Sequence, residues 1–164
     1  MPDDQSPKTS AAAPLVANDV PPRAQASLYP APFADRMQGR EKRTLGDRFG
    51  LQAFGVNLTR LAPGAQSALK HQHSAQDEFI YVVSGEVMLI VDDQEFVLTP
   101  GMCAGFAAGG GSHHLVNRSA ETAAYLEIGD RNLSDEVFYP DDDIQVRPGP
   151  DGRRRYEHKD GTPY

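Results

Sequence analysis

Between Leu51 and Ile128 the sequence consists of short apolar runs that are separated by turn-forming residues. Breaks such as Ala62-Pro63-Gly64 and Thr99-Pro100-Gly101 recur closely, and no helical period is present between them. The predicted strands are 54–61, 68–73, 78–83, 87–91, 95–98, 102–106, 113–117 and 123–128. Short strands with a turn after each are typical of a β-sandwich or a β-barrel.

The segments on either side of this region differ from it in composition. Residues 1–43 are rich in alanine, proline and charge, which predicts an arm that is partly disordered or draped on the rest of the chain. Leu28 and Tyr29 favour the draped form, because a free tail would not need apolar anchors. Residues 131–164 predict a C-terminal extension that packs on the barrel, which leaves residues 44–130 as the barrel core.

Charge and composition exclude several classes of partner. The net charge of −7 and the pI near 5.1 argue against nucleic acid or an anionic membrane. No run approaches the roughly 18 apolar residues that a membrane span needs. Met1-Pro2-Asp3-Asp4 is acidic where a secretory signal is basic, so we expect a cytoplasmic protein. The single cysteine, Cys103, excludes an intramolecular disulfide, and its apolar neighbours predict a buried side chain.

The stretch from His71 to Glu78 combines two histidines and two carboxylates at the start of an apolar run. Alternate side chains of a strand share a face, so His71 and His73 project together and can bind one cation. Either Asp77 or Glu78 can supply a third ligand. The polar triplet before Asp77 is expected to bend the strand, after which Glu78 opens the next one, but the residues alone leave this choice open.

A second pair of histidines, His113 and His114, follows a glycine-rich loop, so that four of the five histidines lie in two clusters. His113 and Asn117 are four residues apart and share a strand face. One of them can therefore bind a metal while the other orients the site or its loop.

The two clusters resemble the two motifs of the cupin superfamily, over roughly residues 50–130. The first motif is a glycine, a His-x-His pair, a glutamate and a second glycine, matched here by Gly64, His71, His73, Glu78 and Gly85. The second motif ends in a glycine, a histidine and an asparagine, matched by Gly110, His113 and Asn117. Ala108 replaces the proline of the second motif.

The resemblance implies an all-β fold, a jelly-roll (cupin) β-barrel. It also implies four metal ligands: His71, His73, Glu78 and His113. His114 would replace His113 if the loop shifted by one residue, and parity with Asn117 favours His113. The implied cofactor is one divalent transition metal per chain, for which iron, manganese, nickel and zinc are equally suitable. The chain most resembles small single-domain bacterial cupins of unassigned activity, a group that often forms homodimers.

Three neutral imidazoles and one carboxylate around a divalent ion leave a net charge near +1, which favours an anionic, oxygen-rich ligand. The predicted function is that of a metal-binding cupin, a mononuclear-metal enzyme of the dioxygenase, decarboxylase or isomerase type that acts on a small organic anion. Tyr81 and His114 are candidates for acid or base roles, and each also fits a structural role.

Two alternatives to this function are considered, of which the first belongs to a different class. The same barrel can serve as a non-catalytic small-ligand binding or sensor protein, because fold alone does not determine function. It can also serve as a sugar isomerase or epimerase. A phosphorylated sugar would need basic side chains, and Lys70 is the only lysine or arginine between Arg60 and Arg118, which argues against a phosphosugar.

Overall fold

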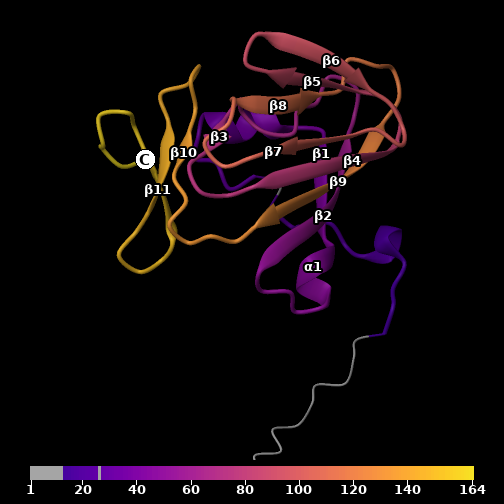
Figure 1. The fold of residues 1–164 in the computed structure, drawn as a ribbon, viewed down its shortest axis with the longest axis horizontal. Helices are drawn as coiled ribbons and strands as arrows, with labels where there is room; N and C mark the ends of the chain where they lie inside the picture. The colour runs from indigo at the N-terminus through magenta and orange to yellow at the C-terminus, as the bar shows by residue number, and fades with distance from the viewer. Residues whose placement is uncertain (1–12, 26) are drawn as a thin grey trace, which may run out of the picture.

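The computed structural model describes residues 13–25 and 27–164, and antiparallel strands dominate it (Figure 1). The strands are β1 (Arg40–Thr44), β2 (Phe54–Leu61), β3 (Gln72–His73), β4 (Glu78–Ser84), β5 (Val87–Val91), β6 (Gln94–Leu98), β7 (Cys103–Phe106), β8 (His113–Val116), β9 (Ala123–Asp130), β10 (Val137–Phe138), β11 (Gln145–Pro148) and β12 (Arg154–Glu157). Helical structure is limited to α1 (Leu45–Arg48) and two 3-10 turns, Ala17–Asp19 and Phe33–Met37. No helix in these residues is long and apolar enough to cross a membrane.

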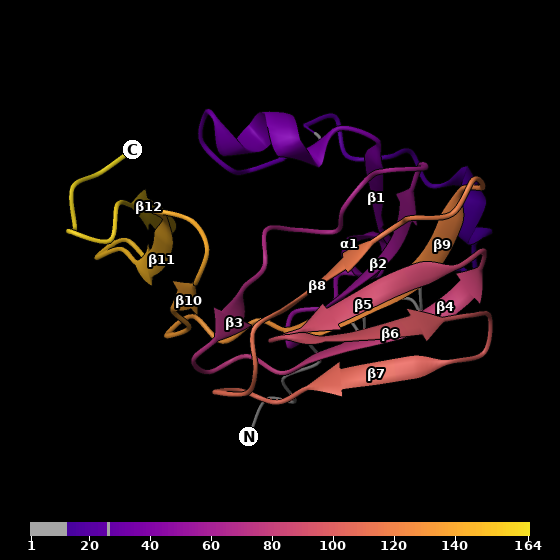
Figure 2. The same ribbon diagram turned by 90° about the horizontal axis from the view of Figure 1, so that it is seen from above.

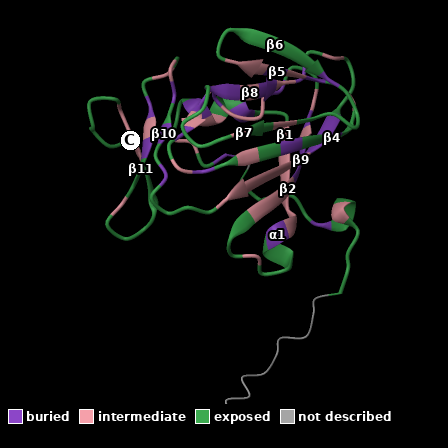
Figure 3. Ribbon diagram, viewed as in Figure 1, coloured by how far each residue is buried: buried purple, intermediate pink, exposed green. Residues whose placement is uncertain are grey.

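Two sheets enclose the main core as a jelly-roll β-barrel. One has the strand order β1-β2-β9-β4-β7 and the other the order β6-β5-β8. Strand β4 turns one face inward: Ile80 and Val82 are buried, whereas Phe79, Tyr81 and Val83 are exposed, and burial alternates along its ribbon (Figure 3). The buried face of β4 packs with side chains from β2, β5, β6, β8 and β9 in one apolar cluster.

A third sheet, with the order β12-β11-β10-β3, lies at one end of the barrel (Figure 2). It shares β3 with the first histidine motif, since Val137 of β10 pairs with His73. A second apolar cluster joins this sheet to the arm, through Phe33, Met37, Leu69, Val137, Tyr139, Ile144 and Val146. Phe33 and Met37 of the arm thus pack against the C-terminal extension, whereas the backbone N–H of Arg23 donates to Lys42 of β1. The part of the arm over residues 1–12 lies outside the described residues.

The predicted strands are present, with differences at the ends and at the flanks. Predicted strands 54–61 and 87–91 coincide with β2 and β5. Predicted strand 68–73 is much shorter, because its first residues contact β8 only through isolated bridges such as His71 with His113. Strand β1 covers the last four residues of the predicted arm and the first residue of the predicted core, and its Arg-Glu-Lys-Arg-Thr sequence carries no apolar alternation that would mark it as a strand.

The prediction that Cys103 is buried is wrong. Cys103 is exposed on β7, the edge strand beside β4. Ala104 and Phe106 are the residues of β7 that pack against the core, so the cysteine occupies the outward face. Apolar neighbours in sequence indicate that a strand is present, but alternate side chains of a strand point to opposite faces, so they do not indicate which way this side chain points.

Candidate metal centre

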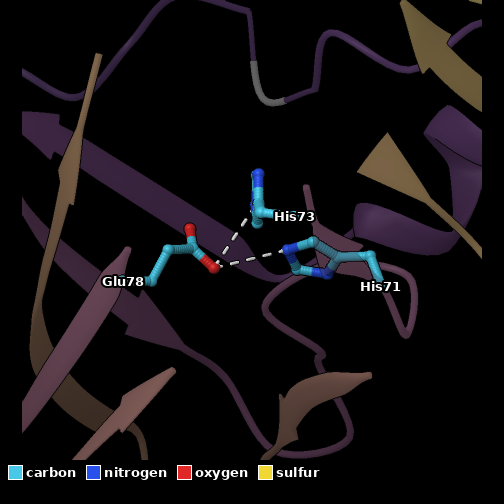
Figure 4. Close-up of side chains that lie close together, drawn as sticks. All are labelled: His71, His73 and Glu78. Carbon is cyan, nitrogen blue, oxygen red and sulfur yellow. Dashed lines mark ion pairs between the residues drawn. The ribbon is translucent and has the colours of Figure 1, made fainter. Parts of the chain in front are cut away.

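The side chains of His71, His73 and Glu78 point toward one another inside the barrel (Figure 4). The Nε2 atoms of His71 and His73 lie 3.6 and 3.4 Å from Oε2 of Glu78. The Nε2 atom of His113 lies 3.0 Å from the same oxygen. One ligand atom from each of His71, His73 and Glu78 falls within 4.8 Å of the others, a grouping that can hold one metal ion.

Backbone pairing brings the two histidine motifs together. His71 and His113 exchange two hydrogen bonds, from His71 N to His113 O at 3.1 Å and from His113 N to His71 O at 2.7 Å. Residues paired in this way project side chains on the same face, and the two rings are 4.9 Å apart between centroids. Glu78 faces them as the first residue of β4.

Hydrogen bonds at Nδ1 orient the imidazoles. The Nδ1 of His71 lies 2.8 Å from the Leu69 carbonyl oxygen, and a carbonyl can only accept, so Nδ1 carries the proton. In the neutral ring this leaves the lone pair on Nε2, which faces Glu78. The Nδ1 of His113 makes a longer contact of 3.4 Å with the Gly111 carbonyl. Each ring thus presents the nitrogen that a metal requires.

Asp135 orients the third ring, and the sequence predictions did not include it. Its Oδ2 lies 2.6 Å from Nδ1 of His73. Its Oδ1 accepts hydrogen bonds from the backbone N–H groups of Ala75 and Gln76, at 2.9 and 3.2 Å. Asp135 is buried, and its contacts hold both His73 of β3 and the bend that follows this strand. Its sequence neighbours, Ser134 and Glu136, resemble an ordinary polar loop, so no local signal marked it.

Aromatic contacts further restrict the rings. Phe106 stacks on His113 with 3.5 Å between centroids and 3° between planes. Tyr139, which belongs to the C-terminal extension, stacks on His71 with 5.9 Å between the ring centroids. Ring rotation at either histidine would lose these contacts, so the donor atoms are held in place before any ion binds.

The electrostatics of the cluster link the carboxylate to the rings. Burial by itself raises the pKa of Glu78, but the hydrogen bonds that the imidazoles donate when Nε2 is also protonated outweigh it and hold that pKa well below its usual range. A metal ion would take the place of those Nε2 protons. Burial lowers the pKa of His73, and the carboxylates of Glu78 and Asp135 outweigh this effect and raise it. Glu78 is therefore ionised, as a metal ligand must be.

Three residues whose roles the sequence left open, Asp77, His114 and Tyr81, lie outside the candidate metal centre. Asp77 is exposed, and its Oδ1 accepts a hydrogen bond from Ala108 N at 2.8 Å, so it supports the second motif's loop. His114 faces away from His113, with Nδ1 3.2 Å from the Ala68 carbonyl. Tyr81 is 42% exposed on the outer face of β4. Neither His114 nor Tyr81 lines the cavity that contains the centre.

That cavity has a volume of about 310 Å³ and reaches from the histidines to the arm and the C-terminal extension. Its polar wall includes Lys42 of β1 and Glu127 of β9, whose Nζ and Oε1 atoms are 2.5 Å apart. Thr59 adds a contact of 3.4 Å to the other oxygen of Glu127. The cavity wall thus combines these polar groups with residues of the apolar core such as Ile80 and Leu115.

The cavity has the positive charge that a phosphosugar needs, although Lys70 is the only lysine or arginine between Arg60 and Arg118. Its basic side chains come from outside that range: Arg23, Arg40, Lys42, Arg131 and Arg154. The arm, β1 and the C-terminal segment close the cavity, so their charges face it although they are distant in sequence from the motifs.

A jelly-roll barrel with histidines and a glutamate converging inside it defines a cupin-type protein. The chain belongs to the cupin superfamily: the Cupin domain family matches residues 57–129. A sugar phosphate isomerase of the cupin superfamily from Silicibacter pomeroyi DSS-3 is similar to it at 39% identity. The alignment covers 93% of this chain and 96% of that one, with a TM-score of 0.85.

Other solved structures are more distant. A candidate sugar phosphate isomerase from Acidithiobacillus ferrooxidans shares 28% identity over 84% of this chain and 95% of that chain, with a TM-score of 0.69. A predicted oxalate decarboxylase from Thermotoga maritima shares 18% identity over 72% of this chain and 98% of that chain, with a TM-score of 0.58, and shows the fold alone. No curated protein matches the chain.

Proposed function

We propose that this chain is a metal-dependent isomerase that acts on a small phosphorylated sugar. The observation that carries the proposal is the convergence of three imidazole Nε2 atoms on the Glu78 carboxylate, inside a cavity that also contains arginines. The similar protein from Silicibacter pomeroyi, a sugar phosphate isomerase, supports the same class of reaction.

The proposed metal ligands are His71, His73, Glu78 and His113. Three nitrogen donors and one carboxylate oxygen suit a divalent transition ion such as iron, manganese, nickel or zinc. When bound, such an ion supplies Lewis acidity toward a carbonyl or hydroxyl oxygen of the substrate. The residual positive charge of such a site favours an anionic ligand.

Sugar isomerisation also needs a group that moves a proton between adjacent carbons, and Glu127 is suited to this role. Glu78 pairs with Gly129 across β4 and β9, so Glu127 is the diagonal neighbour of Glu78 on the inner face. Gly129 has no side chain, so none stands between the two carboxylates. Lys42 holds Glu127 toward the cavity as a carboxylate that can accept a proton.

Metal content tests the first part of the proposal. We expect close to one transition metal per chain in protein purified without chelator, and little in a His71→Ala variant. His158→Ala is the matched control, because His158 is paired with Asp143 outside the cavity. A low metal content that does not respond to His71→Ala would sink the proposal.

Turnover tests the second part. A panel of aldose and ketose phosphates is incubated with the metal-loaded protein in D2O and followed by NMR. Isomer formation with deuterium at the carbon beside the carbonyl is expected, and its loss in Glu127→Gln with unchanged metal content assigns the proton transfer. Metal and ligand binding without any turnover would instead identify a non-catalytic binding protein.

We also propose that the chain forms a homodimer. The outer face of β4 exposes Phe79, Tyr81 and Val83, a row of apolar side chains of the kind that protein interfaces cover. Light scattering on the purified protein is expected to give twice the mass of the 17.9 kDa chain. A monomer at micromolar concentration would contradict it.

A further inference from the structure

Two glycines lie beside Glu78 on the inner face of the five-stranded sheet, in which β2, β9 and β4 are neighbours (Figure 1). Gly129 of β9 pairs with Glu78 on one side and with Gly55 of β2 on the other. Residues that pair across antiparallel strands share a face, and both glycines line the cavity. Because neighbouring strands are about 4.8 Å apart, a strip of bare backbone extends about 10 Å from Glu78.

The backbone does not require glycine at either position of this bare strip. Neither residue has a positive φ. A Cβ atom at Gly129 would have its nearest contacts at 3.5 Å, with Asp77 O and Glu78 Cγ, and one at Gly55 would lie 3.7 Å from Nε of Arg131. These are ordinary van der Waals distances, so alanine would fit. Glycine is less favourable than alanine within a strand, and it often marks a place where a ligand approaches the backbone closely.

Polar side chains border the bare strip along one edge. Glu127 and Asn57 are two residues from Gly129 and Gly55 on the same strands, and they pair with each other across β9 and β2. They therefore project from the same face as the glycines, and both line the cavity. No hydrogen bond joins the Asn57 amide to another residue within 13–25 or 27–164. This amide offers donors and an acceptor to a ligand.

We propose that the bare strip and Asn57 form the subsite for the hydroxylated carbon chain of the ligand. The carbon atoms lie on the backbone of Gly129 and Gly55, next to Glu78 and Glu127, and the Asn57 amide pairs with a hydroxyl group. This inference rests on the proposed function for its ligand class, since it places the reacting carbons between the metal ligand Glu78 and the proton-transfer group Glu127. Binding of the chain itself does not depend on turnover.

A polyhydroxylated chain fits this subsite better than an apolar molecule of the same size does. An apolar ligand would remove water from the Asn57 amide and the Glu127 carboxylate without replacing the lost hydrogen bonds, which is unfavourable. A hydroxyl group both donates and accepts, so it can pair with either side chain. The absence of side chains at the two glycines leaves room for the carbon atoms between these hydroxyl contacts.

The test is calorimetric titration of the full chain, purified without chelator, with the phosphates of sorbitol and ribitol. Both are open-chain sugar phosphates without a carbonyl group, so neither can be isomerised. Binding of at least one is expected in the wild type. Gly129→Ala should weaken it about ten-fold, because the methyl group takes the place of a ligand carbon. Asn57→Ala should weaken it about two- to ten-fold through the loss of a hydrogen bond.

Gly105→Ala is the matched control. Gly105 of β7 pairs with Phe79 on the outer face of the sheet, and a Cβ there would have its nearest contact at 3.8 Å. The same chemical change within a strand should therefore leave ligand affinity unchanged. Metal analysis and thermal unfolding accompany each titration, and the alanine variants should unfold at the wild-type temperature or above it. If Gly129→Ala loses its metal, Gly55→Ala decides, because Gly55 is one strand further from Glu78.

Three results would overturn the subsite: no binding of either compound by the wild type, unchanged affinity in Gly129→Ala and Gly55→Ala, or equal weakening in Gly105→Ala. The proposed isomerase could fail while the sugar alcohol phosphates still bind in a Gly129-dependent way. Conversely, isomerisation whose KM does not change in Gly129→Ala or Asn57→Ala would leave the isomerase standing without this subsite.

Discussion

Oδ2 of Asp135 lies 2.6 Å from Nδ1 of His73, and this contact joins the C-terminal extension to the first histidine motif. The residues are brought together by β10, whose Val137 pairs with His73. The extension therefore takes part in the candidate metal centre in addition to packing on the barrel.

Asp135→Asn is expected to lower metal affinity about 10- to 100-fold, because the acceptor that orients His73 loses the negative charge that raises the basicity of the ring. Competition with a chromophoric chelator measures this affinity. Asp143→Asn is the control, since Asp143 makes a similar 2.8 Å contact with His158 at the surface. Equal effects of the two substitutions would show that Asp135 has no special relation to the metal.

Glu78→Gln and Asp77→Asn separate the two neighbouring carboxylates. Glu78→Gln is expected to abolish stoichiometric metal binding, because a neutral amide replaces the carboxylate on which the three imidazoles converge. Asp77→Asn should retain the metal, since this side chain supports Ala108 outside the cluster. Elemental analysis of both variants is decisive, and metal loss in Asp77→Asn alone would reverse the ligand assignment.

Lys42→Met should destabilise the fold by about 1–3 kcal/mol, because it leaves the largely buried Glu127 carboxylate without its cation. Adding Glu127→Gln to this variant should recover part of the loss, since the remaining amide no longer needs a counter-charge. Urea unfolding of the two single variants and the double variant measures the coupling. Additive losses would show that the pair contributes nothing as a pair.

Two glycines of the first motif should respond differently to alanine. Gly64 has a φ of +80° and open space around it, so Gly64→Ala is expected to cost about 1–2 kcal/mol from backbone strain alone. Gly85 has a φ of +73°, and a Cβ there would lie 2.7 Å from Cα of Ala123, so Gly85→Ala should cost at least about 1 kcal/mol more. Urea unfolding compares the two, and equal losses would exclude a packing requirement at Gly85.

Local pattern was enough to predict the barrel strands and the shared face of His71 and His73. Alternation and turn residues are properties of a few neighbouring positions, and both are visible in a strand such as β2 or β5. Motif spacing then favoured Glu78 over Asp77, and the structure places Glu78 at the point of convergence.

Pattern was uninformative where a residue's role depends on a distant partner. The sequence REKRT of β1 becomes a strand because β2 supplies its hydrogen bonds, and Cys103 is exposed because of the face that β7 turns outward. Asp135 acquires its role only when β10 lies beside β3. Each of these contacts joins segments that are distant in sequence, whereas strand propensity reflects only a few neighbouring residues.

The sequence by itself therefore determined a barrel of short strands and most of the residues that lie together at its candidate metal centre, because both follow from strand periodicity and short spacings. Only the tertiary structure decided which side chains orient those ligands and which charges share their cavity. Arg23, Arg40 and Arg154 are separated by more of the chain than any periodic pattern spans, and packing of the arm and the C-terminal sheet against the barrel brings them to one cavity.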